Sequence, residues 1–139
     1  VSLRYHRDQD DTVSVRQNLG LLVVSGRPTS AALAGGGPWG ATLGSDPAVA
    51  RSGLGTTAEG DVVFAGAMHA MPADIAEGLI AGGAVTGMQL DINPSWVTLG
   101  TTPSPGGSLV SQVPGETNAA TIFQSPTRSA RFPSCSHHR

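Results

Sequence analysis

Charged and aromatic side chains are scarce in this chain of 139 residues, at 13% and 4% of the total. The formal net charge is −2, so the chain offers no broad basic surface for a nucleic-acid backbone, and we expect no nucleic-acid partner. With so few aromatic residues, the core must consist of Ala, Val, Leu and Ile. Such a core buries less apolar area per residue, and we expect modest stability.

Cysteine is nearly absent, and long apolar runs are missing. A single cysteine, Cys135, excludes a disulfide within the chain, and its neighbours His137 and His138 lack the spacing of a metal site. The longest apolar run, residues 19–24, is strand-sized and far below the ~18 residues that span a bilayer, so no transmembrane segment is expected. The sequence therefore identifies no metal-binding residue, and it leaves the metal requirement and any cofactor open.

Glycine and proline are abundant, at 19 and 10 residues, which indicates a chain that turns often. The length fits one domain, which we place at residues 1–124, with residues 125–139 expected to be a disordered tail. Short apolar stretches and one helical pattern predict an α+β fold, a mixed sheet with one or two short helices. Strands are predicted at residues 19–24, 48–54, 61–65 and 87–93, and a loop at residues 29–40.

One helix is predicted at residues 73–81. Pro72 suits a first helical position, and Ile75, Leu79 and Ile80 fall on one face, which we expect to pack on the sheet. Two consecutive glycines, residues 82–83, end the pattern.

The most informative segment follows this helix. In residues 87–93 apolar and polar side chains alternate, with Gln89, Asp91 and Asn93 on the polar side. Pro94 then breaks the strand, and Ser95 adds a hydroxyl. A buried-type strand that ends in Asp-x-Asn-x-Ser is typical of a binding site.

Two motifs resemble the phosphodiester glycosidase family, which includes the domain of the lysosomal uncovering enzyme. Residues 51–55, Arg-Ser-Gly-Leu-Gly, resemble the family's Arg-Thr-Ala-Ile-Gly strand. Residues 90–96, Leu-Asp-Ile-Asn-Pro-Ser-Trp, stand where the family carries Leu-Asp-Gly-Gly-Gly-Ser-Ser, in a form similar to an actinobacterial branch that residues 15–19 also resemble. Order and spacing agree over about residues 13–99.

The chain also departs from the family's pattern. Ile92, Asn93 and Pro94 replace the glycine triplet, the upstream Asn-Gly-Gly-Phe segment is absent, and the closing part is not recognisable after Pro103. The chain also begins on Val1 without a signal region. We therefore expect an incomplete copy of the family domain, a fragment or a processed chain.

The resemblance implies hydrolysis of a sugar-1-phosphodiester, in exopolysaccharide or cell-envelope metabolism, by a secreted or envelope protein. A carbohydrate phosphodiester would be the substrate. Asp91 would be the catalytic carboxylate, Arg51 would clamp the phosphate, and Asn93 and Ser95 would bind sugar or phosphate.

Each assignment has a structural alternative. Asp91, Asn93 and Ser95 could form the turn before Pro94, and Arg51 could be an ordinary strand residue. The glycines at 53 and 55 could admit a ligand to backbone amides, or belong to a plain hairpin spanning residues 52–65.

Three further polar residues are weaker candidates for the site. His69 lies between a strand and the helix, where a loop could reach the site, whereas Glu59 and Asp61 are expected to be solvated beside a turn. The alternative to an enzyme is a non-catalytic remnant that binds carbohydrate or only packs within a larger protein. The isolated chain would then be inactive.

Overall fold

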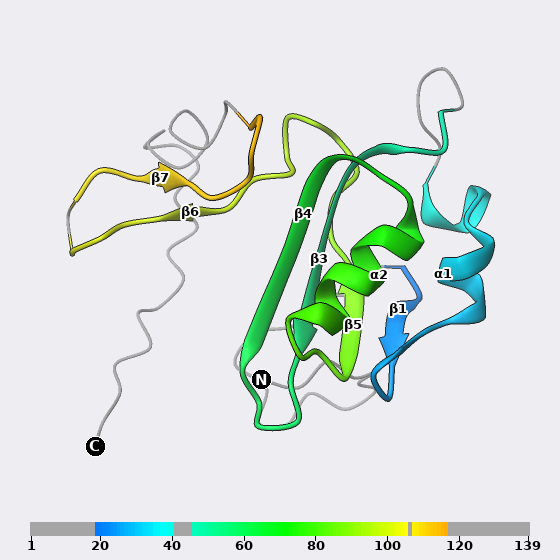
Figure 1. Cartoon of the computed structure of the whole chain (residues 1–139). Coiled ribbons are helices and arrows are strands. Elements are labelled where there is room, and N and C mark those ends of the chain that lie inside the picture. The colour runs from blue at the N-terminus through cyan, green and yellow to red at the C-terminus, as the bar shows by residue number, and fades with distance from the viewer. Residues whose placement is uncertain (1–18, 41–45, 106, 117–139) are drawn as a thin grey trace, which may run out of the picture.

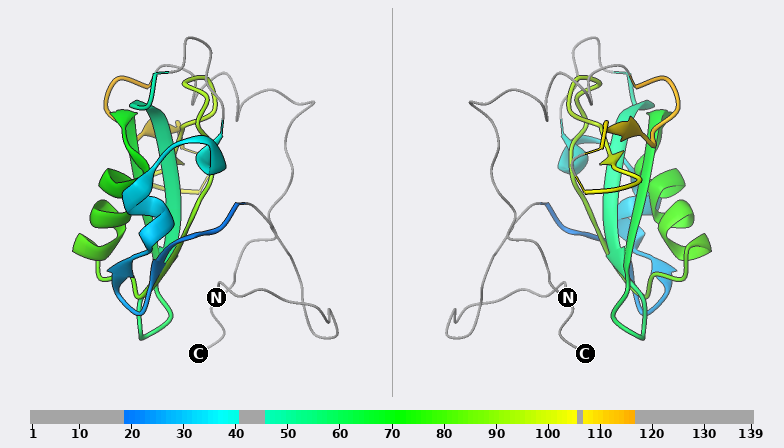
Figure 2. Two further views of the ribbon diagram at one scale, coloured as in Figure 1. Left: turned by 90° about the vertical axis from the view of Figure 1, so that its right-hand side faces the viewer. Right: turned by 90° about the vertical axis from the view of Figure 1, so that its left-hand side faces the viewer.

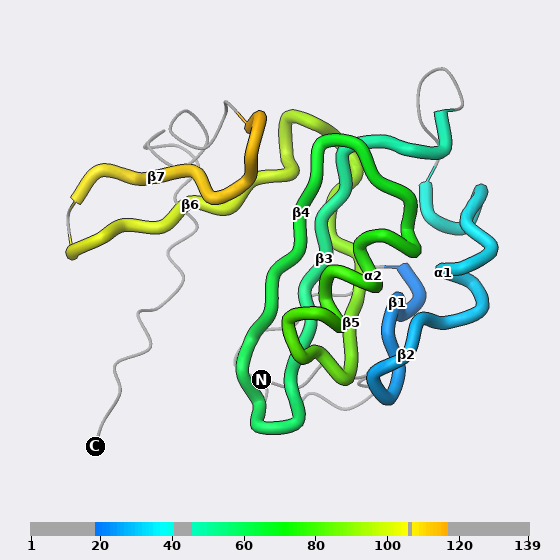
Figure 3. Tube along the Cα trace, viewed as in Figure 1, coloured from blue at the N-terminus to red at the C-terminus, as the bar shows by residue number. Residues whose placement is uncertain are grey.

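The computed structural model describes residues 19–40, 46–105 and 107–116, and all structural statements below concern these ranges. Figure 1 shows the chain as a ribbon and Figure 3 as a Cα tube. The elements are, in order, β1 (Leu21–Val24), β2 (Arg27–Pro28), α1 (Ser30–Ala34), the short 3-10 helix η1 (Gly37–Trp39), β3 (Val49–Thr56), β4 (Val62–Ala70), α2 (Pro72–Ala81), β5 (Thr86–Gln89), β6 (Gly100–Thr101) and β7 (Val110–Ser111).

Five of these strands form one sheet in the order β2-β1-β5-β3-β4. Every described pairing in it is antiparallel. The predicted α+β class is therefore confirmed, and the sheet that we expected to be mixed is antiparallel throughout the described ranges. The predicted hairpin at residues 52–65 is confirmed as part of the longer β3–β4 pair, whose turn is closed by a hydrogen bond of 2.9 Å from the amide of Thr57 to the carbonyl of Asp61.

Helix α2 confirms the helix predicted at residues 73–81. Pro72 occupies its first turn, and Asp74 Oδ2 accepts a hydrogen bond of 2.7 Å from the amide of Met71, which caps an otherwise unpaired donor. The helix ends at Ala81 and is capped by Gly82, which is followed by Gly83 with a φ of +88°, a conformation that favours glycine.

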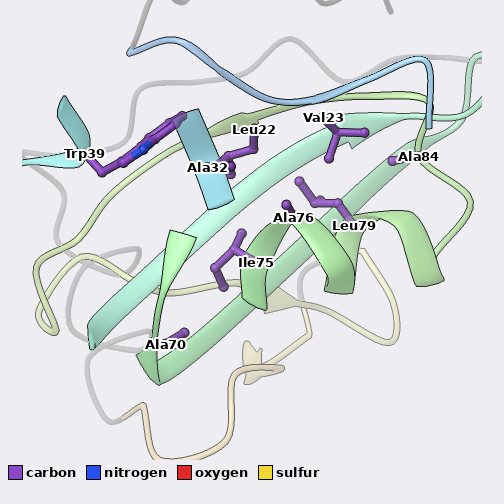
Figure 4. Close-up of a cluster of buried hydrophobic side chains, with 9 residues drawn as sticks. All are labelled: Leu22, Val23, Ala32, Trp39, Ala70, Ile75, Ala76, Leu79 and Ala84. Atoms are coloured by element: carbon purple, nitrogen blue, oxygen red, sulfur yellow. The ribbon is translucent and has the colours of Figure 1, made fainter. Parts of the chain in front are cut away.

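Both helices cover one face of the sheet, as the edge-on views of Figure 2 show. Ile75 and Leu79 are buried, and Ile80 packs against the same core, as predicted. Figure 4 shows Ile75 and Leu79 in one cluster with side chains from β1 and from the segment around α1. The buried members of this cluster are Leu22, Val23, Ala32, Trp39, Ala70, Ile75, Ala76, Leu79 and Ala84.

Small residues in the sheet allow α2 to approach closely. A Cβ added at Gly87 would lie 2.7 Å from Leu79 Cδ1, and one at Gly53 would lie 2.7 Å from Ile75 Cγ2. A Cβ at Gly55 would meet that of Ala84 at 2.6 Å. Three glycines on two neighbouring strands therefore form the hollow that receives the apolar face of α2.

The opposite face of the sheet is partly covered by the chain that follows β5. Val97 and Val113 pack there with Ala50 of β3, together with the partly buried Phe64 and Met68 of β4. These residues form a second small core, which ties the segment to the sheet at Val97 and at Val113. Residues 96–99, which begin this segment, form the end of a turn and an irregular stretch.

The predicted loop at residues 29–40 contains two short helices, α1 and η1. Thr29 caps α1, because its Oγ1 accepts a hydrogen bond of 3.2 Å from the amide of Ala32. Trp39 fixes the end of this segment, since it is 1% exposed and its Nε1 donates to the carbonyl of Ala31 at 2.8 Å. None of the described helices has the length and apolar character needed to cross a membrane.

Candidate functional site

Asp91 leaves the sheet at the end of β5, where the pairing with β3 becomes irregular. The amide of Leu90 donates to the carbonyl of Ser52 at 2.8 Å, whereas the amide of Ser52 donates to the carbonyl of Asp91 at 2.9 Å. Two consecutive residues thus oppose one, which is the arrangement of a β-bulge. The strict alternation predicted for residues 87–93 therefore ends before Asp91.

The hydroxyl of Ser52 holds the backbone of Asp91 on both sides. Ser52 Oγ accepts a hydrogen bond of 3.2 Å from the amide of Asp91 and lies 3.4 Å from its carbonyl oxygen, to which it donates. Ser52 is 2% exposed, so this contact is shielded from water. No sequence signal marked Ser52, because its role depends on the pairing of β3 with the end of β5.

The segment after Asp91 is a tight turn built from its own polar side chains. Asp91 Oδ1 accepts from the amide of Asn93 at 2.8 Å, and Asn93 Oδ1 accepts from the amide of Ser95 at 2.9 Å. The carbonyl of Asn93 then accepts from the amides of Trp96 and Val97, at 2.8 and 3.0 Å. The local hydrogen bonds of the structural alternative are therefore present.

The turn still presents polar groups to solvent. Asn93 and Ser95 are exposed and Asp91 is half-buried. One carboxylate oxygen of Asp91 accepts the bond of the turn, and the other, Oδ2, has no partner among the residues that the structure describes. Within one short segment the turn thus offers a carboxylate oxygen, an amide and a hydroxyl, the groups that hydrogen-bond to sugar hydroxyls.

Arg51 lies inside the protein at the same end of the sheet. It is 3% exposed, on the face that carries α2. Its Nε donates to the carbonyl of Ala70 at 3.0 Å, and its Nη1 donates to Gln89 Oε1 at 2.7 Å and to the carbonyl of Trp39 at 3.2 Å. Its Nη2 donates to the carbonyl of Pro47 at 3.4 Å.

These bonds give the guanidinium an internal role. Desolvation by burial lowers the pKa of Arg51 from its ordinary value, which means that the charged form is disfavoured there and is held by the hydrogen bonds. Arg51 thus joins the start of β3 to the ends of β4 and β5 and to the loop at Trp39. Its expected phosphate contact stays a prediction, and it would compete with these four bonds.

Gln89 is the second buried polar residue of this network and was not singled out from the sequence. It is 1% exposed, and its Nε2 donates to the carbonyl of Trp39 at 3.1 Å while its Oε1 accepts from Arg51. The polar side of the predicted strand thus includes a core residue at Gln89 and a half-buried one at Asp91. The hydrogen bond with Arg51 explains why a polar residue is tolerated in the core at position 89.

The remaining candidates have simple surroundings. Gly53 and Gly55 make room for α2, so packing explains why neither position carries a side chain. His69, Glu59 and Asp61 are exposed. In the described ranges no group of three His, Cys, Asp or Glu side chains could hold a metal ion. Cys135, His137, His138 and the predicted tail lie outside these ranges.

Comparisons with models of known families, with curated proteins and with solved structures found no match for this chain. Membership of the phosphodiester glycosidase family therefore stays a prediction from the two motifs. The two motifs and the geometry of the turn at residues 91–97 are the features of the chain that point to a function.

Proposed function

We propose that the turn at residues 91–97 binds a sugar-1-phosphodiester and that Asp91 supports its glycosidase-type hydrolysis. The observation that carries the proposal is the environment of Asp91. Its backbone is held by Ser52, one carboxylate oxygen is fixed by the turn, and Oδ2 has no partner in the described ranges. A carboxylate held in this way requires little reorganisation to stabilise developing positive charge.

The proposed reaction breaks the bond between the anomeric carbon and the phosphate oxygen. The electron pair leaves with the phosphate monoester, and water adds to the sugar and loses a proton. Phosphate monoesters have a second pKa of ~6, so this leaving group departs without a protonating side chain. Most glycosidases need a second carboxyl group as the acid, but with this leaving group a single carboxylate beside the cation-like sugar is sufficient.

The experiment uses the methyl phosphodiester of a hexose 1-phosphate as substrate, in water enriched with oxygen-18. Cleavage of the sugar–oxygen bond places the label on the hexose, and cleavage of the phosphorus–oxygen bond places it on phosphate. Mass spectrometry of the products should show labelled hexose and unlabelled methyl phosphate. Label on phosphate, or no turnover by folded protein, would reject the proposed reaction.

The second candidate is a carbohydrate-binding chain without catalysis. One specific observation favours it: the side-chain oxygens Oδ1 of Asp91 and Asn93 are both used to form the turn, and the guanidinium of Arg51 is used inside the protein. This candidate predicts that the same diester binds without turnover. It also predicts that Asp91→Asn retains binding, because an amide keeps the bond to the amide of Asn93.

A further inference from the structure

The two tryptophans of the chain differ sharply in environment. Trp39 is 1% exposed and belongs to the core under α1, whereas Trp96 is 42% exposed in the turn that follows Asp91. A packed indole normally buries 150–250 Å² of apolar surface, roughly, so the exposure of Trp96 leaves a large apolar area in contact with water. Neither the motifs nor the proposed chemistry gives Trp96 a role.

The backbone of Trp96 is held on both sides, so its exposure is not the fraying of a loose loop. Its amide donates to the carbonyl of Asn93 at 2.8 Å. The next residue, Val97, is fully buried and packs with Ala50 and Val113. The fold therefore fixes the point from which the indole emerges.

The surroundings of Trp96 in the chain are polar. The same turn carries the half-buried Asp91 and the exposed Asn93 and Ser95. One short turn thus carries both a flat apolar ring and hydrogen-bonding side chains, and this combination suits a pyranose, which has faces lined by C–H bonds and a rim of hydroxyl groups. Ligand sites commonly combine an aromatic surface with a few hydrogen-bonding groups in this way.

We propose that Trp96 is the surface on which the pyranose ring of the ligand stacks, while the polar groups of the turn bind its hydroxyls. This inference rests on the proposed function and names the part of the substrate that is recognised first, the hexopyranose ring rather than the phosphate. The protein should therefore still bind a ligand that lacks the phosphate, and it should not bind a ligand that lacks the sugar ring.

The test is a titration of the protein with three probes, followed by tryptophan fluorescence and by calorimetry. The probes are methyl glucopyranoside, the methyl phosphodiester of glucose 1-phosphate, and dimethyl phosphate, which has no ring. Both sugars should bind and shield the exposed Trp96 from quenching by acrylamide, whereas dimethyl phosphate should do neither. Trp39 is already shielded, so the change reports on Trp96.

Trp96→Ala should weaken the binding of both sugars at least tenfold, and Trp96→Tyr, which keeps an aromatic ring, should recover most of it. Leu33→Ala is the matched control, because Leu33 is 62% exposed on α1, and it should leave binding unchanged. The fold of each variant is checked by circular dichroism. If Trp96→Ala fails to fold, the quenching measurement on the unsubstituted protein decides.

The outcomes separate this inference from the proposed catalysis. Sugar binding that depends on Trp96 without turnover supports the stacking surface and rejects the enzyme. Absence of sugar binding by the folded chain, or binding that leaves quenching and the Trp96→Ala affinity unchanged, overturns the inference. An indole that proves to be shielded by association of the protein with itself or with another protein, and not by sugar, overturns it as well.

Discussion

The hollow that receives α2 allows a quantitative test of the packing described here. Leu79 is fully buried, and its Cδ1 would lie 2.7 Å from a Cβ at Gly87. Leu79→Ala should lower the free energy of unfolding by about 3 kcal/mol, the sum of lost apolar burial and a residual cavity. Gly87→Ala should lower it by about 2 kcal/mol, because the added methyl overlaps Leu79 and also lies 3.3 Å from Val23.

The double variant distinguishes this geometry from two independent defects. With the Leu79 side chain shortened, the methyl at Gly87 enters the space that Cδ1 occupied, so the combined loss should be smaller than the sum by about 1–2 kcal/mol. Urea denaturation gives the free energy of unfolding of the unsubstituted protein, the two single variants and the double variant. Leu33→Ala, at an exposed position, is the control, and its free energy of unfolding should lie within about 0.5 kcal/mol of that of the unsubstituted protein. Strictly additive losses would show that Leu79 and Gly87 do not meet and would refute the reasoning.

Three further predictions concern the site and its support. Arg51→Lys should lower the free energy of unfolding by about 2–4 kcal/mol, measured by urea denaturation, because one ammonium cannot reach the four oxygens that the guanidinium contacts; an unchanged stability would contradict the internal role. Asp74→Ala should cost about 1 kcal/mol by thermal denaturation through loss of the cap on α2, whereas Glu77→Ala, exposed on the same helix, should cost little. Ser52→Ala should speed hydrogen exchange of the Asp91 amide about tenfold, and unchanged exchange would mean that the hydroxyl does not hold this backbone.

Much of the fold follows from local sequence. Helix α2 was predictable because Pro72, the spacing of Ile75 and Leu79, and the two terminal glycines all agree. The β3–β4 hairpin was predictable from a turn between two apolar strands. Helix α1 was missed because a segment of five residues is too short to show a periodic pattern. The only local signal was Thr29, a residue type that often caps the start of a helix.

The site was less predictable, because its geometry depends on distant segments. Asp91 and its turn could be located from the Asp-x-Asn-x-Ser spacing alone. The bulge opposite Ser52 depends on strand pairing, and the burial of Arg51 depends on carbonyls from Trp39 and Ala70. Charged residues are rarely buried, so a sequence pattern favours a surface or ligand role for such an arginine until its internal partners are known.

The most direct test of the central claim compares the unsubstituted protein with Asp91→Asn in the hydrolysis of the hexose-1-phosphate methyl diester. Asparagine keeps Oδ1 and its hydrogen bond to the amide of Asn93 but removes the charge, so the turn and the free energy of unfolding should change little. If the carboxylate stabilises the cation-like sugar, kcat should fall by about a thousandfold or more with a much smaller change in KM. Near-normal turnover by Asp91→Asn would contradict the account and leave Asp91 as a turn-forming residue.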